Sequence, residues 1–105
     1  MAQIIKAKCT SCGFETDFLL GGGRRDYLTN CSAPAIDQQA GAFAIANYID
    51  HESNPRYTFY NDTSLQGKGS KDHIETSRIK LNANNNSCPT CKNFSLNFRM
   101  IGSAD

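Results

Sequence analysis

Four of the five cysteines in this 105-residue chain occur as two C-x-x-C pairs. Cys9 and Cys12 lie in KCTSCGFE, and Cys88 and Cys91 lie in SCPTCK. A C-x-x-C turn directs two thiolates to the same side, so two such turns complete a tetrahedral shell of four sulfur ligands around one ion. Thiolates in that geometry select zinc, or iron under some conditions. The spacing therefore predicts one shared Zn(Cys)4 site.

The distance between the two pairs is unusual. Paired C-x-x-C motifs of zinc sites are commonly about 15 to 20 residues apart, whereas Cys12 and Cys88 are separated by most of the chain. We therefore expect a single domain over residues 1–105, in which residues from about 21 to 86 form an insertion whose two ends return to the same place. The entropic cost of closing a loop grows only slowly with its length, so such an insertion is tolerable.

The two pairs differ in the residue that follows them. Gly13 follows Cys12 and can adopt the positive φ that turns backbone N–H groups toward a sulfur. Lys92 stands at the matching place after Cys91, so we expect Asn93, which tolerates left-handed conformations, to make the second turn one residue later. Three lysines near the ligands in sequence are expected to offset some of the negative charge of a Zn(Cys)4 centre: Lys6, Lys8 and Lys92.

KCTSCGFE and CPTC resemble the two knuckles of zinc-ribbon or rubredoxin-like domains, and IIKAKCTSCGFETDFLLGGG is similar to the start of small bacterial zinc-ribbon proteins. The resemblance covers about the first 23 and the last 18 residues, and residues between them resemble no family. It implies antiparallel β-hairpins with Cys9, Cys12, Cys88 and Cys91 as ligands. Zinc ribbons bind nucleic acid, protein or only zinc, so the fold does not decide the function.

Hydrophobic patterning predicts a mainly β protein with antiparallel pairing and one helix. Alternation of apolar and polar residues favours strands over 3–8, 14–20, 56–60, 73–81 and 93–100. In the last of these strands four side chains should share one face: Phe94, Leu96, Phe98 and Met100. The helix is expected over residues 37–50 with Asp37 as its N-cap, although Gly41 costs roughly 1 kcal/mol relative to Ala and alternation from Ala42 to Ala46 also suits a strand.

Three other residues could bind a metal. Cys31 stands alone in NCSAPA, and we expect it to be a small buried apolar residue rather than a fifth ligand or a reactive thiol. His51 and His73 each lack a second potential ligand nearby in sequence, so both are expected in solvent-exposed loops.

Two stretches could contact a nucleic acid. In LGGGRRDY, successive glycine N–H groups and the side chains of Arg24 and Arg25 could bind phosphate, although a flexible loop with two solvated arginines is the more common use of this pattern. In RYTFYND, the aromatic residues from Tyr57 to Tyr60 could stack on bases, but core packing is the commoner role of alternating Tyr and Phe.

Composition limits the function without identifying it. A net charge of +1 gives no overall attraction to nucleic acid or anionic membranes, although a local patch would. The sequence lacks a bilayer-spanning apolar run and a signal-peptide pattern, and the odd cysteine count argues against a disulfide scaffold, so a cytoplasmic protein with reduced thiols is expected.

These observations leave three hypotheses. The first is a non-catalytic module that binds nucleic acid or protein and contains structural zinc. The second is a rubredoxin-like iron electron-transfer protein, or a protein whose C-x-x-C pairs act as dithiols. The third is a purely structural accessory protein. We find no triad or paired-carboxylate signature, so nothing in the sequence argues for an enzyme.

Overall fold

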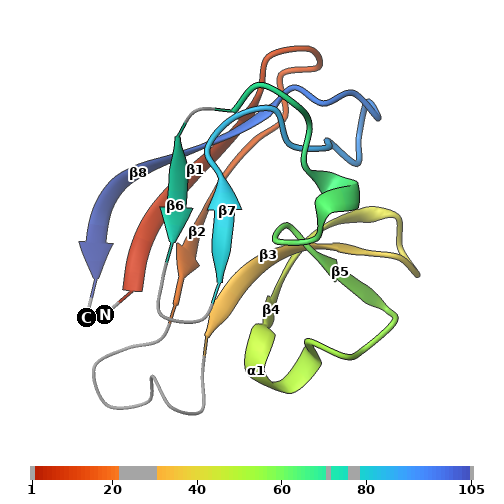
Figure 1. Ribbon diagram of the computed structural model, residues 1–105, viewed down its shortest axis with the longest axis vertical. Coiled ribbons are helices and arrows are strands. Elements are labelled where there is room, and N and C mark those ends of the chain that lie inside the picture. Colours follow the sequence, from red (N-terminus) through yellow and green to blue (C-terminus); the bar gives the residue numbers. More distant parts are fainter. Residues whose placement is uncertain (1, 22–30, 71, 76–78, 105) are drawn as a thin grey trace.

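The computed structural model describes residues 2–21, 31–70, 72–75 and 79–104, and within them it is mainly β. The strands and helices are arranged along the chain as follows (Figure 1): β1 Ala2–Cys9, β2 Glu15–Leu20, β3 Ser32–Asp37, β4 Ala42–Asn47, α1 Tyr48–His51, β5 Tyr57–Phe59, the 3-10 helix η1 Thr63–Leu65, β6 His73–Glu75, β7 Lys80–Asn82 and β8 Leu96–Ala104. The predicted fold class is therefore confirmed: small antiparallel sheets with very little helix.

The first sheet, called here the terminal sheet, has the strand order β2-β1-β8. β1 lies in its centre and pairs antiparallel with both neighbours, so Cys9 lies opposite Leu96 and Ile5 lies opposite both Phe18 and Met100. The alternation predicted for the first strand is confirmed, because Ile5 and Ala7 are buried while Lys8 is exposed. The sheet thus joins a strand from the first part of the sequence to one from the last part.

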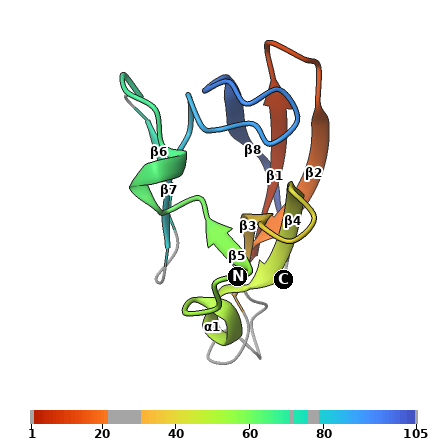
Figure 2. The ribbon, with the colours of Figure 1, turned by 90° about the vertical axis from the view of Figure 1, so that its right-hand side faces the viewer.

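The remaining strands form two further units. β4, β3 and β5 make a second antiparallel sheet, the middle sheet, and β6 pairs with β7 in a hairpin. Figure 2 shows the hairpin and the terminal sheet on opposite sides of the molecule, with the middle sheet closing the end near α1. Buried side chains from all three units fill the space between: Ile5, Ala7, Phe18, Leu20, Ala33, Ala35, Phe59, Tyr60, Leu81, Leu96 and Phe98.

An aromatic cluster connects the terminal and middle sheets. The Phe43 ring of β4 lies 5.8 Å from the Phe18 ring of β2 and 5.9 Å from Tyr60, centroid to centroid. The Phe98 ring of β8 lies 5.2 Å from Tyr60 and 5.6 Å from Phe18, edge to face in both cases. Edge-to-face pairs at these distances add to the stabilisation from burial. Core packing, the expected role of the Tyr57–Tyr60 aromatics, is confirmed for Phe59 and Tyr60, which are buried.

The predicted helix over residues 37–50 is wrong, because this stretch is mostly a β-hairpin. Asp37 ends β3 and caps a tight turn instead of a helix: its Oδ1 accepts hydrogen bonds from the N–H groups of Gln39 at 3.0 Å and Ala40 at 3.4 Å. Gly41 adopts a φ of 66°, which leads the chain back into β4. Left-handed backbone at Gly41 breaks a helix, and the competing alternation from Ala42 to Ala46 prevails. Only Tyr48–His51 is helical.

Two expected strands also differ from the structure. Where one strand over residues 73–81 was expected, the described residues form two short antiparallel strands, β6 and β7. In the last strand, Leu96 and Phe98 share the buried face as predicted, but Phe94 is 50% exposed and Met100 is 57% exposed. Phe94 precedes β8, which begins at Leu96, and Met100 lies beside a register shift opposite Ile4 and Ile5. In the part of the chain that the structure describes, no helix has the length and apolar character needed to cross a membrane.

Candidate metal centre

The first knuckle is the turn that joins β1 to β2. The N–H of Cys9 donates to the carbonyl of Phe14 at 2.8 Å, and the N–H of Gly13 donates to the carbonyl of Cys9 at 3.1 Å. Gly13 has a φ of 81°, a conformation that costs other residues free energy because of their Cβ atom. Glycine after the second cysteine therefore allows the chain to turn back into β2 while the two sulfurs stay on one side.

The second knuckle repeats this geometry position by position. The N–H of Cys88 donates to the carbonyl of Asn93 at 2.9 Å, and the N–H of Lys92 donates to the carbonyl of Cys88 at 2.8 Å. The expectation that Asn93 makes the left-handed turn is wrong, since Lys92 itself has a φ of 66°. The hydrogen-bond pattern of the turn requires the left-handed residue directly after the second cysteine, whatever its side chain.

The two knuckles bring their four sulfurs together. The Sγ atoms of Cys9, Cys12, Cys88 and Cys91 all lie within 4.8 Å of one another. Cys9 Sγ is 3.5 Å from Cys91 Sγ, and Cys12 Sγ is 3.7 Å from Cys88 Sγ. A tetrahedral shell with metal–sulfur bonds of ~2.3 Å has sulfur–sulfur separations of ~3.8 Å. The cluster therefore has the size of a four-thiolate metal site.

Two short sulfur–sulfur distances join one knuckle to the other. Cys9 to Cys91 and Cys12 to Cys88 each connect cysteines more than 70 positions apart in sequence. The cysteines fulfil the geometric requirement of a shared ion, which needs every sulfur close to every other. No disulfide joins the cysteines in the described residues.

Burial divides the cluster into an inner and an outer side. The first cysteine of each knuckle, Cys9 or Cys88, is at most 1% exposed, whereas Cys12 is exposed and Cys91 is partly exposed. The inner pair is continuous with the hydrophobic core, and the outer pair borders the solvent. A metal ion held here would tie the core to the surface turns.

Two contacts that the sequence pattern did not reveal position the inner cysteines. The Ser95 hydroxyl lies 3.1 Å from Cys9 Sγ, and its carbonyl accepts a hydrogen bond from the N–H of Thr10 at 3.1 Å. The buried Tyr60 hydroxyl donates to the carbonyl of Ser87 at 2.6 Å, directly before Cys88. Ser95 and Tyr60 lie outside the C-x-x-C motifs, so only their place in the fold identifies them.

The thiols influence one another's ionisation. Burial acts to raise the pKa of Cys9, but hydrogen bonds from Ser95 and from the backbone N–H groups of Cys12 and Ser11 outweigh it and lower the pKa to about 6. For Cys12, a hydrogen bond from the Phe14 backbone acts to lower the pKa, but desolvation and the three neighbouring sulfurs raise it to about 12. Four thiolates at these distances repel one another, and a bound cation removes that repulsion.

The structure separates the other candidate residues from this cluster. Cys31 is 3% exposed in the core and lies outside the group of four sulfurs, as expected of a buried apolar residue. His73 is exposed, but it lies in β6 rather than in a loop. His51 differs more from the expectation: it is half-buried in α1, where its ring lies 5.2 Å from that of Tyr57. Arg24 and Arg25 lie outside the described residues.

Three lysines were expected to offset the negative charge of the cluster. Lys6 forms an ion pair with Glu15, Nζ to Oε1 3.4 Å, across the outer face of the terminal sheet. Lys92 is exposed within the second knuckle, and Lys8 is exposed one residue before Cys9. Charge compensation of the cluster by these residues stays a prediction.

No protein-family model, curated protein or solved structure matches this chain. The interpretation of the site therefore depends on its own geometry.

Proposed function

We propose that this protein is a small zinc-binding module with one structural Zn(Cys)4 site formed by Cys9, Cys12, Cys88 and Cys91. The observation that carries the proposal is the convergence of four Sγ atoms within 4.8 Å from two turns of equivalent backbone geometry. When bound, zinc would supply a rigid tetrahedral tie without redox chemistry. Such a tie stabilises a chain of this size, whose core is modest.

The same observations support a zinc ribbon whose knuckles are far apart in sequence. In this proposal the terminal sheet and the two knuckles form the ribbon, and residues from about 21 to 86 are an insertion that carries the middle sheet and the β6–β7 hairpin. The antiparallel pairing of β1 with β8 returns the two knuckles to one place. The wide separation of the C-x-x-C pairs thus has a structural explanation.

Metal analysis of the purified protein tests the site. We expect one zinc per chain by elemental analysis and by native mass spectrometry, with reduced cysteines. Replacement of zinc by cobalt should give the d–d absorption of a tetrahedral thiolate site, which reports the ligand geometry directly. Less than half an equivalent of any metal after purification and zinc reconstitution would contradict the proposal.

The biological role that we propose for the module is non-catalytic binding of nucleic acid or protein. The adjacent Arg24 and Arg25, after a run of three glycines, offer forked donors for phosphate. Labelled single- and double-stranded DNA and RNA should be titrated at low and at moderate salt. Binding that falls steeply with salt and weakens by about tenfold or more when both arginines become alanine supports nucleic acid. No binding to any of them would leave protein as the proposed partner.

An iron site with electron transfer is the second candidate, and the exposed Cys12 favours it. An iron ion in the same four thiolates would accept and release one electron, and a ligand at the surface provides a short path to a redox partner. The visible spectrum of the protein as isolated separates the two candidates. Ferric iron in four thiolates is red, whereas zinc is colourless.

A further inference from the structure

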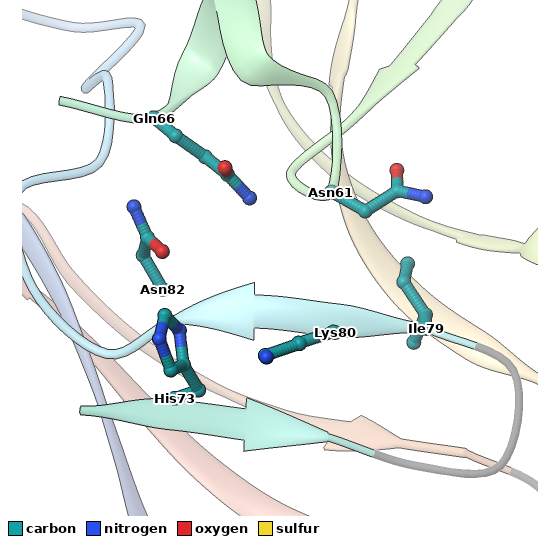
Figure 3. Close-up of a pocket in the computed structure, with 6 residues that line it drawn as sticks. All are labelled: Asn61, Gln66, His73, Ile79, Lys80 and Asn82. Atoms are coloured by element: carbon teal, nitrogen blue, oxygen red, sulfur yellow. The ribbon is translucent and has the colours of Figure 1, made fainter. Parts of the chain in front are cut away.

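A second feature lies away from the sulfur cluster, between the β6–β7 hairpin and the segment that follows β5. It is a pocket of about 450 Å³, and the described residues that line it are Asn61, Gln66, His73, Ile79, Lys80 and Asn82. Figure 3 shows the side chains of His73, Lys80 and Asn82 directed into the same space, with Gln66 on the opposite wall. Pockets that hold small ligands have volumes of about 300 to 1,000 Å³, so the space suits a small molecule.

The hairpin places three hydrogen-bond donors on one face. His73 and Asn82 are directly opposite each other in the antiparallel pairing, and Lys80 precedes Asn82 by two positions in the same strand. Side chains at such positions share a face of a two-stranded sheet. The other face carries Leu81, which is buried in the core. The hairpin therefore holds its polar face rigidly toward the pocket.

Asn82 is the most informative of the three. The residue is 9% exposed, and among the described residues no side-chain hydrogen bond of its carboxamide occurs, although its polar atoms are not fully enclosed. Its carboxamide therefore borders the pocket and can hydrogen-bond to water or to a ligand there. Lys80 likewise forms no ion pair within the described part of the chain. The donor groups of Asn82 and Lys80 are thus available to bind a ligand.

The opposite wall provides an acceptor. Gln66 Nε2 donates to the carbonyl of Tyr60 at 3.0 Å, which fixes the amide and leaves its Oε1 as an acceptor. The Asn61 amide is fixed in a similar way, because its Nδ2 donates a hydrogen bond to the Tyr48 hydroxyl at 3.1 Å. A ligand that fits this pocket therefore needs an anionic, acceptor-rich end toward the hairpin and a hydroxyl-bearing or amino-bearing end toward Gln66.

From this arrangement we infer that the pocket binds a phosphate monoester of nucleotide or sugar-phosphate size. A phosphate monoester carries a charge of about −1.5 to −2 and three strong acceptor oxygens, which match the three donors of the hairpin. None of the described residues that line the pocket is acidic. Glu75 lies opposite Lys80 in register on the same face of the hairpin, and its carboxylate opposes an anion there. This site is independent of the metal and goes beyond the proposed function.

The inference is tested by titrating the metal-loaded, isotope-labelled protein and following its backbone amide resonances. Four probes separate the possible sources of binding: inorganic phosphate, adenosine monophosphate, glucose 6-phosphate and adenosine. We expect saturable shifts of His73, Lys80 and Asn82 with at least one phosphate ester, and affinity at least about tenfold weaker for adenosine. The ester that binds with the higher affinity shows whether the ligand is a nucleotide or a sugar phosphate. A dissociation constant weaker than about 10 mM for both esters would overturn the inference.

Variants link the binding to the named residues. Lys80 is exposed, so Lys80→Ala should not affect folding, but it should weaken binding of the tighter-binding ester by about tenfold or more. Lys68 is also exposed but lies outside the pocket, so Lys68→Ala should leave the affinity unchanged. Glu75→Gln should strengthen binding by about twofold, because it removes a nearby like charge. Asn82→Asp keeps the side-chain shape but adds a carboxylate, and it should abolish binding with the fold intact. Equal affinity of the Lys80→Ala and Lys68→Ala variants would refute the site.

Discussion

The two knuckles have one backbone design and two different sequences. Each cysteine turn has the same pair of hydrogen bonds and the same left-handed residue after the second cysteine, but that residue is Gly13 in the first knuckle and Lys92 in the second. The first knuckle also has the Ser95 hydroxyl beside its inner sulfur, and the second is fixed through the carbonyl of Ser87 by Tyr60. The geometry of a cysteine turn therefore tolerates an unfavourable residue when a tertiary contact or a metal holds it in place.

The largest effect should come from removing an inner cysteine, and it should be the same in both knuckles. Cys9→Ser and Cys88→Ser should each lose stoichiometric zinc and unfold the hairpins, because metal binding of small domains contributes ~10 kcal/mol or more to folding. Zinc content and circular dichroism melting measure both effects. Cys31→Ala is the control and should keep the metal. A Cys9→Ser or Cys88→Ser variant with a full equivalent of zinc and an unchanged melting temperature would contradict a shared site.

The next largest effect should separate the knuckles. Ser95→Ala removes the hydroxyl beside Cys9 and should weaken zinc binding by about 10- to 100-fold, as is usual for residues that support metal ligands. Competition with a chelator measures this change. Ser11→Ala, an exposed serine in the same knuckle, is the matched control. If both variants bind zinc equally well, the Ser95 contact does not support the ligand.

A smaller effect is expected at the left-handed glycine. Gly13→Ala should destabilise the protein by about 1–2 kcal/mol, because a Cβ atom is unfavourable at its φ of 81°. The new Cβ would have no atom within 4 Å, so the loss reflects backbone strain alone. Urea unfolding at fixed zinc concentration gives the value. A neutral substitution would mean that the turn relaxes to another conformation.

The smallest effect should have the opposite sign. Lys92→Gly should stabilise the protein by about 0.5–1 kcal/mol, since it relieves the left-handed strain at a cost in chain entropy. Lys92→Ala removes the charge but keeps the Cβ, so the difference between the two variants isolates the strain from the electrostatics. Equal stability of Lys92→Gly and Lys92→Ala would show that the second knuckle carries no strain.

Part of the fold and of the metal site could be predicted from the sequence. The strands on either side of the first knuckle followed from strict alternation, and the convergence of the four cysteines followed from the chemistry of paired thiolates. Residues 37–50 were predicted incorrectly because the apolar positions fit both periods, and only pairing with β3 and the left-handed Gly41 decide for strands. Local pattern cannot contain the information that a neighbouring strand supplies.

The details of the sites were less predictable for a similar reason. Asn93 is the better left-handed residue by intrinsic preference, yet Lys92 occupies that conformation because the hydrogen bonds of the turn fix the position. Ser95 near the sulfurs and the residues around the pocket beside the β6–β7 hairpin come from separate segments that meet only after folding. Asn61, Gln66 and Asn82 carry no motif, and nothing in their spacing indicates a common site.

The pairing of the first and last strands has a consequence for how the protein is made. Cys12 and Cys88 are 76 positions apart, so at about 5–20 residues per second the second pair of thiols follows the first by roughly 4–15 s of synthesis. During that time β1 has only β2 as a partner, and the first knuckle can offer an ion only two cysteine ligands. Until β8 emerges, the nascent chain exposes both the unpaired edge of β1 and the two thiols of the first knuckle, so this interval is when the protein is most open to oxidation and to mispairing.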